Sequence, residues 1–436
     1  MMNFNTFNNE YQIGQKCLII AEIGQNHQGQ METALQMIKV AKECGADCVK
    51  FQKSNINEKF TQNALQRPYQ SPNAFGATYG EHKAFLEFSI EQFKELQSFA
   101  HSINVLFTAS AMDEKSYHEL RSLNVPFIKI GSGDNNNWIM LENLTKDDKM
   151  PLVISTGMQD FKSVQKIGEI FKTRKNIAVL HCISSYPTQA NDVYLRFIEV
   201  YQRLFPNHVI GYSGHESTPI VISLGAVALG AKIIERHFTL DKKLKGSDHS
   251  CSLEPSELSN LVHLIRILET KELKSNDTES IIELIKIVIL EADLPHLLKD
   301  LDLLKLALVD VSPDDKKLFD CELNCFNKLR KTLVYASNIP AGSVINRTDF
   351  EIKVHTEHGN VATEEMSSLI GKKLVKDRAC FSGSAANGMK TPGDDDDADE
   401  LLLRPSAFLA SLGFVNPSIT SECLGGAAIA FNFVFL

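Results

Sequence analysis

The chain lacks the features that nucleic-acid-binding and membrane proteins share. Its 45 Lys and Arg residues are outnumbered by 54 Asp and Glu residues, and the formal net charge is −9. No basic stripe interrupts this balance, so we expect no nucleic-acid partner. No secretory apolar segment follows Met1. The apolar stretch at residues 424–436 is too short to span a bilayer as a helix, and we expect no membrane partner.

The cysteines form no pattern typical of disulfides or of zinc. Nine are present, and most lie inside apolar runs, as Cys17, Cys48 and Cys182 do. Buried, reduced thiols of this kind predict a cytoplasmic protein. Cys321 and Cys325 have helical spacing, but no residues near them complete a zinc set.

What the chain has instead is a regular alternation of short β-rich runs and amphipathic segments. Its 436 residues leave room for a large domain and a smaller one. The alternation predicts a (β/α)8 TIM barrel, an α/β fold. A doubly wound sheet would also alternate strands and helices, but it gives no reason for polar residues after nearly every strand. The eight runs are residues 17–21, 48–51, 105–109, 127–130, 152–155, 177–182, 209–213 and 232–237.

Nearly every predicted strand carries, at or near its end, a side chain that can take part in chemistry. In a barrel these ends meet at one mouth, which is the catalytic face. The residues are Glu22, Lys50, Thr108, Lys129, Ser132, Ser155, Ser184, Tyr186, Ser213, His215 and His237.

The lysines and hydroxyls in this set suit a small anion that bears both carboxylate and phosphate. Ammonium groups neutralise the charge, while hydroxyls and loop amides donate hydrogen bonds to the oxygens. The glycines after Lys129 would let the backbone approach a phosphate closely. Glu22 and Asp248 accept hydrogen bonds and could orient sugar hydroxyls. A salt bridge or a helix cap is the alternative role for these two carboxylates.

Two histidines, His215 and His237, follow neighbouring predicted strands. Neutral imidazole is the commonest protein ligand of borderline divalent metals. The pair, followed by the polar run from Lys245 to His249, predicts a metal site with open positions. The alternative is two partly buried structural histidines.

The rest of the chain divides by composition. The long connection at residues 53–89 is either a wall or lid of the site or a solvated insertion. We expect the barrel at residues 1–272, an inserted helical segment and linker at 273–328, and a small second domain at 329–378. Residues 379–436 contain linker-like and acidic runs, which predict a disordered or aberrant tail.

Several motifs resemble the sialic acid synthase family, in both wording and order, over about residues 17–377. Its members join a (β/α)8 barrel to a small antifreeze-like (SAF) domain. They condense phosphoenolpyruvate with an N-acetylmannosamine and release phosphate. The wording is most similar to the animal branch, which uses N-acetylmannosamine 6-phosphate and makes N-acetylneuraminate 9-phosphate. The motifs are Ala21-Glu-Ile-Gly-Gln-Asn-His-Gln-Gly29, Ile128-Lys-Ile-Gly-Ser-Gly-Asp134, Ile154-Ser-Thr-Gly-Met158, Ser185-Tyr-Pro187, Gly211-Tyr-Ser-Gly-His215 and Glu235-Arg-His-Phe-Thr239.

The resemblance implies roles for residues at matching positions. His215 and His237 would hold a divalent cation, Mn²⁺ or Mg²⁺, and a homodimer is implied. Glu22, Gln52, Tyr186 and Asp248 would orient the open-chain sugar, with Glu22 and Asp248 counted as catalytic beside the histidines. The residues expected to bind substrate are Lys50, Gln52, Thr108, Lys129, Ser132, Asp134, Ser155, Ser184, Tyr186 and Ser213.

Three alternatives to this function remain open from the sequence. The barrel could use another acceptor, either unphosphorylated N-acetylmannosamine or mannose 6-phosphate. It could make a different keto sugar acid. Because the tail departs from the family after about residue 377, the chain could also be a poorly active isoform that binds ligand or pairs with a full-length subunit.

Overall fold

A closed barrel of eight parallel strands forms the centre of the computed structural model, which describes residues 3–5, 10–12, 16–147, 149–217, 220–355 and 362–378. β10 pairs with both β9 and β3 and so closes the ring. The predicted barrel is confirmed, and all eight predicted strands are present with ends that shift by a few residues. The strands are β3 (Leu18–Gly24), β4 (Cys48–Lys53), β5 (Leu106–Ala111), β6 (Ile128–Ile130), β7 (Leu152–Ser155), β8 (Ile177–Cys182), β9 (Val209–Gly214) and β10 (Ile233–His237).

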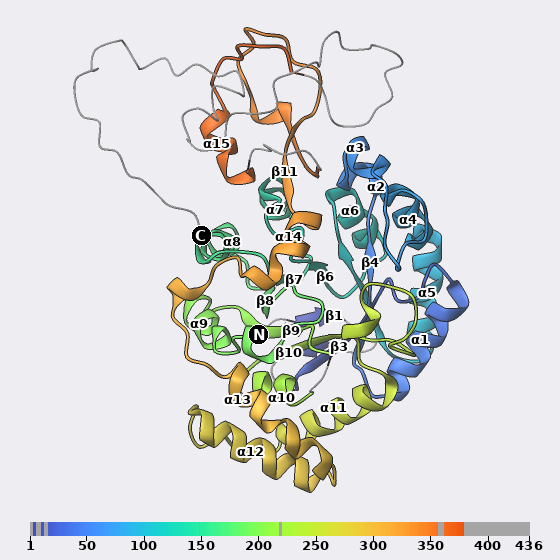
Figure 1. The fold of residues 1–436 in the computed structure, drawn as a ribbon, viewed down its shortest axis with the longest axis vertical. Coiled ribbons are helices and arrows are strands. Elements are labelled where there is room, and N and C mark those ends of the chain that lie inside the picture. The colour runs from blue at the N-terminus through green and yellow to red at the C-terminus, as the bar shows by residue number, and fades with distance from the viewer. Residues whose placement is uncertain are drawn as a thin grey trace, which may run out of the picture.

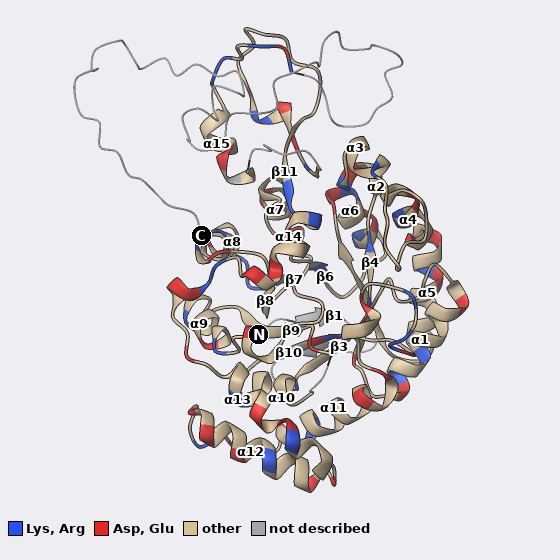
Figure 2. Cartoon of the chain, viewed as in Figure 1, with Lys and Arg blue, Asp and Glu red and all other residues tan. Residues whose placement is uncertain are grey.

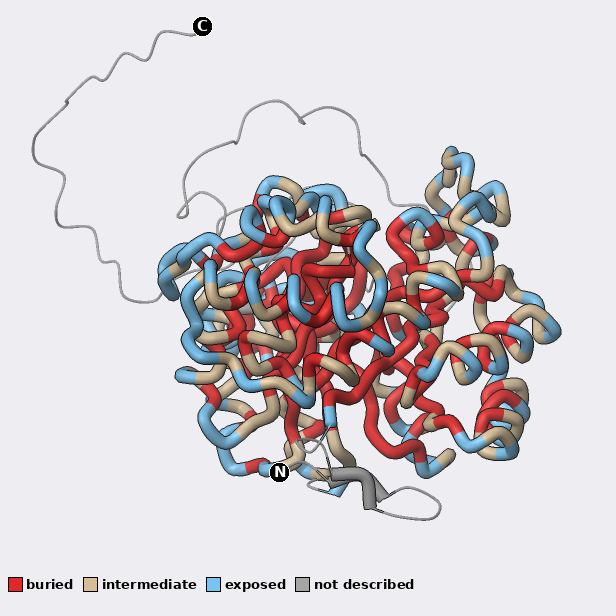
Figure 3. Tube along the Cα trace, turned by 90° about the horizontal axis from the view of Figure 1, so that it is seen from below, coloured by how far each residue is buried: buried red, intermediate tan, exposed pale blue. Residues whose placement is uncertain are grey.

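Amphipathic helices surround the strands (Figure 1). Some of them are capped at the first turn by a side chain: Asp113 and Asp160, for example, each accept a hydrogen bond from the amide three residues later, at 2.8 Å. Buried residues gather in the strands and exposed residues on the outer helices (Figure 3). The surrounding helices are α1 (Met31–Glu43), α5 (Ile90–Ser102), α6 (Glu114–Ser122), α7 (Trp138–Leu144), α8 (Phe161–Phe171), α9 (Phe197–Leu204), α10 (Val221–Ala228) and α11 (Pro255–Leu268).

The interior of the barrel changes from apolar to polar along each strand. On β3, Leu18 and Ile20 belong to a buried apolar cluster, and Glu22, the next residue of the same face, lines a cavity. On β10, Ile233 lies in the cluster, while Glu235 and His237 line the cavity. Side chains alternate along a strand, so every second residue of these strands faces the barrel interior. The earlier inward residues form the apolar floor of the cavity, and the last ones, at the carboxyl end, line the cavity itself.

The segment predicted to be an insertion packs on the barrel wall. It contains α12 (Thr278–Glu291), η3 (Pro295–Asp300) and α13 (Leu301–Ala307), as helical spacing predicted. Ile281, Ile285 and Leu304 are fully buried in the same core as the barrel helices. Figure 1 shows α12 and α13 beside α10 and α11, and Figure 2 shows that the charged residues of α12 are mostly acidic. The insertion therefore extends the barrel's core.

The second domain contains an antiparallel pair, β11 (Lys331–Tyr335) and β12 (Phe350–Val354), and the short helix α15 (Met366–Leu369). It has a core of its own, formed by residues such as Leu333, Ile352 and Leu369. Its antifreeze-like character and the domain boundaries stay predictions. The predicted tail, 379–436, lies outside the described residues.

The long connection between β4 and β5, residues 53–89, is structured and contacts the second domain. It forms α2 (Ile56–Lys59), α3 (Gln62–Gln66) and α4 (Tyr79–Leu86). The amide of Thr61 donates to the carbonyl of Val354 on β12 at 3.1 Å, and Phe60, Tyr79 and Val354 share one apolar cluster. An antiparallel pair that the sequence did not predict, β1 (Asn3–Asn5) with β2 (Glu10–Gln12), precedes the barrel. Within the described chain, no helix is both long and apolar enough to cross a membrane.

Candidate active site

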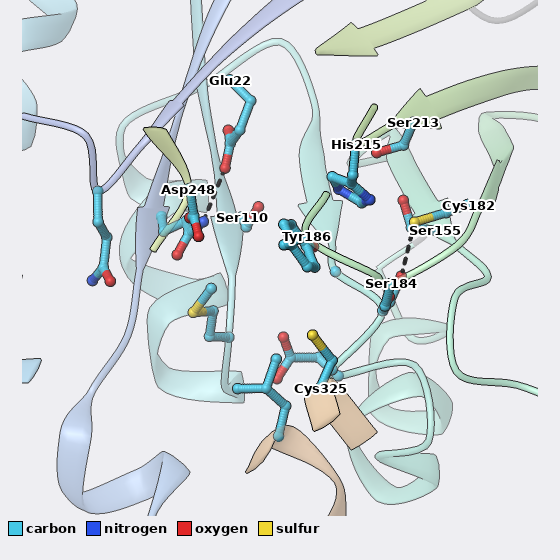
Figure 4. Close-up of a pocket in the computed structure, with 18 of the residues that line it drawn as sticks. Glu22, Ser110, Ser155, Cys182, Ser184, Tyr186, Ser213, His215, Asp248 and Cys325 are labelled. Carbon is cyan, nitrogen blue, oxygen red and sulfur yellow. Dashed lines mark hydrogen bonds between the residues drawn. The ribbon is translucent and has the colours of Figure 1, made fainter. Parts of the chain in front are cut away.

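One cavity opens at the carboxyl ends of the strands, and almost every predicted site residue lines it. Figure 4 shows Glu22 and Asp248 on one side, Ser155, Ser184 and Ser213 on the other, and Tyr186 with His215 between them. The structure thus brings together side chains from all eight strands or their following loops. The predicted residues in the lining are Glu22, Lys50, Gln52, Lys129, Ser132, Asp134, Ser155, Ser184, Tyr186, Ser213, His215, His237 and Asp248.

Thr108 is the exception, and its predicted place in the lining is wrong. It is fully buried and donates a hydrogen bond to the carbonyl of Phe127 on the next strand. Ser110, two residues further along β5, lines the cavity and accepts a hydrogen bond from Lys50 Nζ at 3.0 Å. The strand runs one layer further than its predicted end, so the polar residue at the mouth is the later one.

The two lysines are paired with carboxylates instead of forming a purely cationic ring. Lys50 Nζ lies 2.5 Å from Glu22 and 3.6 Å from Glu235. Lys129 Nζ donates to both Glu235 oxygens at 2.7 Å. All four side chains are buried. Sequence reasoning missed Glu235, although it stands two residues before His237 on the same face of β10.

This network moves the pKa values of the two carboxyls in opposite directions. Burial tends to raise the pKa of Glu235, but Lys129 and Lys50 outweigh it and lower that pKa to about 2. Burial raises the pKa of Glu22 above its ordinary value, and Lys50 offsets this only in part. Glu235 therefore stays ionised as the counter-charge of the lysines, while Glu22 takes up a proton more readily.

The serines form a cradle of hydroxyls beside the lysines. Ser155 Oγ and Ser184 Oγ are buried without a hydrogen-bond partner among the described residues. Ser132 Oγ accepts a hydrogen bond from the amide of Gly157 at 3.0 Å. A Cβ on Gly157 would clash with Ser184 Oγ, so a larger residue there would displace that hydroxyl. A buried hydroxyl without a hydrogen-bond partner lowers the stability of the folded protein unless a ligand supplies that partner. These two hydroxyls are placed to donate hydrogen bonds to an anion.

The two histidines lie side by side with ring centroids 5.4 Å apart. His215 Nδ1 bonds the carbonyl of Ile183 at 2.8 Å, which directs Nε2 away from that carbonyl. His237 Nδ1 is buried with no hydrogen-bond partner in the described part of the chain. A hydrogen bond from the imidazole to a backbone carbonyl, such as His215 makes, is typical of metal-ligating histidines. The pair fits a divalent cation, although no group of three or more His, Cys, Asp and Glu in the described ranges is arranged to hold one.

The remaining predicted residues have partners of their own. Gln52 Nε2 donates to Glu22 at 3.1 Å, and Ser247 Oγ donates to Asp248 at 2.6 Å. The Tyr186 ring packs on His215 with centroids 4.1 Å apart. Asp134 lines the cavity, but its carboxylate accepts a hydrogen bond from Lys331 Nζ at the start of β11. Asp134 thus ties the second domain to the barrel mouth.

Two walls of the cavity come from outside the barrel strands. Tyr79 and Lys83 of α4 line it, so the long connection is a wall of the site, one of the two predicted possibilities. Lys328 of α14 (Leu323–Leu329) also lines it, with its ammonium 5.9 Å from the Tyr79 ring centroid. Burial, with a smaller effect from Lys328, lowers the pKa of Lys83 to about 8. Sequence reasoning missed Lys328, because α14 does not follow a barrel strand directly.

A barrel with a buried lysine–carboxylate network, a serine cradle and paired histidines at its catalytic mouth is typical of an enzyme that acts on small anions. Comparison with protein families agrees with this. Residues 37–276 match the model of the NeuB family. The chain belongs to this family of sialic acid synthases, and the resemblance inferred from its motifs is confirmed.

The most similar relatives include two animal proteins, each named N-acetylneuraminate-9-phosphate synthase. The Mus musculus protein is 46% identical over 360 residues, which are 82% of this chain and 89% of the relative. The Drosophila melanogaster protein is 47% identical over 359 residues, 82% of this chain and 91% of the relative.

Solved structures show the same fold. The N-acetylneuraminic acid (sialic acid) synthetase of Leptospira borgpetersenii, solved with citrate, is 30% identical at a TM-score of 0.51, covering 66% of this chain and 90% of its own. The spore coat polysaccharide biosynthesis protein spsE of Bacillus subtilis has a TM-score of 0.63 at 24% identity, covering 88% of this chain and 98% of its own, and likeness at that identity concerns the fold alone.

Proposed function

We propose that this chain condenses phosphoenolpyruvate with N-acetylmannosamine 6-phosphate to give N-acetylneuraminate 9-phosphate and inorganic phosphate. The observation that carries the proposal is the serine cradle beside Lys129, in which two buried hydroxyls lack partners. The name shared by animal relatives at 46–47% identity supports the same reaction.

The chain's own residues account for most of this chemistry. Lys50, Lys129 and the cradle serines would bind the carboxylate and phosphate of phosphoenolpyruvate. Glu22, Gln52, Tyr186 and Asp248 would hold the open-chain sugar with its aldehyde next to the methylene carbon of phosphoenolpyruvate, as the family resemblance implies. Alignment of the two substrates and stabilisation of charge would supply the rate gain.

The reaction balances without a covalent enzyme intermediate. A carbon–carbon bond forms between the methylene carbon and the aldehyde carbon, and the aldehyde oxygen takes up a proton, for which Glu22 is the carboxyl with the raised pKa. Water adds to the carbon that bears the phosphate ester. Collapse of this tetrahedral centre breaks the ester bond and releases phosphate.

We also propose that His215 and His237 hold Mn²⁺ or Mg²⁺. When bound, the cation would polarise the sugar aldehyde as a Lewis acid. The support is the donor set itself: two imidazoles at the cavity, one oriented by a backbone carbonyl and one with a buried, unpartnered nitrogen.

A cytoplasmic location, a homodimer and an antifreeze-like second domain complete the proposal. The cysteines in the described part of the chain are all free thiols, which supports a reducing compartment. The support for the homodimer and for the nature of the second domain is the family resemblance.

The deciding experiment is phosphate release by the purified full chain with phosphoenolpyruvate and Mn²⁺. Three acceptors are compared: N-acetylmannosamine, its 6-phosphate and mannose 6-phosphate. Turnover with N-acetylmannosamine 6-phosphate alone, at roughly 1 s⁻¹ or more, supports the proposal. Preference for another acceptor replaces the proposed substrate, and no release from a folded protein that binds phosphoenolpyruvate favours the poorly active isoform.

A further inference from the structure

A fully buried carboxylate from the linker reaches the active-site loops, although no step of the proposed reaction uses it. Glu322 ends the short helix η5 (Asp320–Glu322) and has no exposed surface. Its Oε1 accepts hydrogen bonds from the amide of Met158 at 2.7 Å and the amide of Ser184 at 2.8 Å. One oxygen therefore joins the loop after β7 to the loop after β8.

The backbone that Glu322 holds is strained. Met158 has φ of 59°, in the left-handed region that residues other than glycine seldom adopt, and such a conformation costs roughly 1–2 kcal/mol. A hydrogen bond from an amide to an ionised carboxylate is stronger than one to a neutral carbonyl. The carboxylate thus stabilises a loop conformation that the chain alone disfavours.

The same segment is fastened to the β7 loop at a second point. Lys316 Nζ donates to the carbonyl of Gln159 at 2.7 Å, and the amide of Phe161 donates to the carbonyl of Lys316 at 3.0 Å. Glu322 Oε2 also accepts a hydrogen bond from the amide of Phe319 at 3.2 Å, which orients its carboxylate. The linker and the β7 loop therefore form one unit.

The two unpartnered hydroxyls of the cradle lie in or next to the loops joined by Glu322: Ser184 is in the loop after β8, and Ser155 is the last residue of β7. Ser184 supplies both an amide to Glu322 and a free Oγ to the cavity. Ser155 lies three residues before Met158, and Gly157 between them donates to Ser132. A shift of either loop would move these hydroxyls relative to each other.

We propose that Glu322 is a positioning residue of the anion site, which fixes the loops after β7 and β8 so that Ser155 and Ser184 together meet phosphoenolpyruvate. The inference rests on the proposed function because it takes phosphoenolpyruvate as the anion. Glu322 does not line the cavity, and it acts on the site only through the hydrogen bonds that it accepts from the amides of Met158 and Ser184.

The test compares Glu322→Gln with a matched control, Asp47→Asn. Asp47 is a half-buried carboxylate that also accepts a hydrogen bond from a backbone amide, that of Ile19 at 2.8 Å, but it precedes β4 at the opposite end of the barrel. Direct binding of phosphoenolpyruvate by calorimetry needs no sugar. We expect Glu322→Gln to weaken it about tenfold or more and to change the KM of the sugar less than threefold. Asp47→Asn should lower the melting temperature without changing phosphoenolpyruvate affinity.

Glu322→Asp provides a second variant if Glu322→Gln does not fold. It keeps the charge but withdraws the oxygens by one methylene, so phosphoenolpyruvate affinity should still fall. Wild-type affinity in a folded Glu322 variant whose melting temperature drops as in Asp47→Asn would overturn the inference, since Glu322 would then be structural only. A wild-type protein that does not bind phosphoenolpyruvate would instead overturn the proposed function.

Discussion

The buried pair of Lys129 and Glu235 makes a sharp prediction about stability. In Lys129→Met, Glu235 stays buried and loses both 2.7 Å hydrogen bonds to the ammonium. The Glu235 carboxylate then keeps two partners, Lys50 Nζ at 3.6 Å and Ser213 Oγ at 3.3 Å. Removing one partner of a buried ion pair costs about 3–5 kcal/mol, chiefly because the other charge is left uncompensated. We expect the free energy of unfolding to fall by an amount in this range.

A double-mutant cycle separates this effect from loss of packing. Glu235→Gln alone should also be destabilising, because Lys129 is then buried without a counter-ion. The double variant Lys129→Met/Glu235→Gln removes both charges, and Lys50 keeps its ion pair with Glu22, whose carboxylate lies 2.5 Å from Nζ. Its destabilisation should be smaller than the sum of the two single costs by about 2 kcal/mol or more.

The assay is urea unfolding of the four proteins at pH 7.5, followed by circular dichroism. Single-variant costs that add within about 0.5 kcal/mol would refute the reasoning, since they would mean that the two charges do not stabilise each other in the folded protein.

Three further predictions concern the metal, the pH dependence of affinity and acid stability. His237→Ala should abolish Mn²⁺ binding measured by electron paramagnetic resonance, and unchanged binding would contradict the metal role. Because the pKa of Lys83 is about 8, its positive charge is lost as pH rises above 8, so the KM of anionic substrates should increase between pH 7 and 9. Lys83→Met should show a high KM that does not change over this range, and an unchanged rise in Lys83→Met would exclude Lys83 as its source. Burial lowers the pKa of His181 to about 3, so the folded state excludes a proton that the unfolded chain binds below pH 6.5. This residue should therefore destabilise the protein by about 2 kcal/mol at pH 5 relative to pH 7, and urea unfolding of wild type and His181→Gln at both values measures the difference.

Much of the site could be predicted because strand ends need no knowledge of distant packing. In a parallel barrel, every carboxyl end lies at the same mouth, so Ser155, Ser213 and His237 had to meet once the eight strands were recognised. The period of two along β10 also contained Glu235, which could have been found by counting back from His237. The prediction for Thr108 was wrong for a related reason. β5 continues one layer beyond its predicted end, so Ser110 and not Thr108 lines the cavity.

Other features depend on packing between segments far apart in the chain. Glu322 reaches loops more than 130 residues earlier, and no local pattern marks it, since a glutamate beside a short helix is more often a cap. The same holds for Lys328 of α14 and for Lys331, whose ammonium pairs with Asp134 across the domain boundary. The choice between wall and solvated insertion for residues 53–89 was likewise open until Tyr79 and Lys83 were seen in the cavity.

The sequence by itself determined the barrel, the end of the barrel that carries the chemistry and the family, because hydrophobic periodicity and short motifs are local properties. Only the tertiary structure decided which charges neutralise one another, which loops are held in place and which helices complete the walls. Many of those features depend on distances between residues far apart in the chain, as between Lys129 and Glu235. Such distances are set when the barrel closes and the linker packs across its mouth.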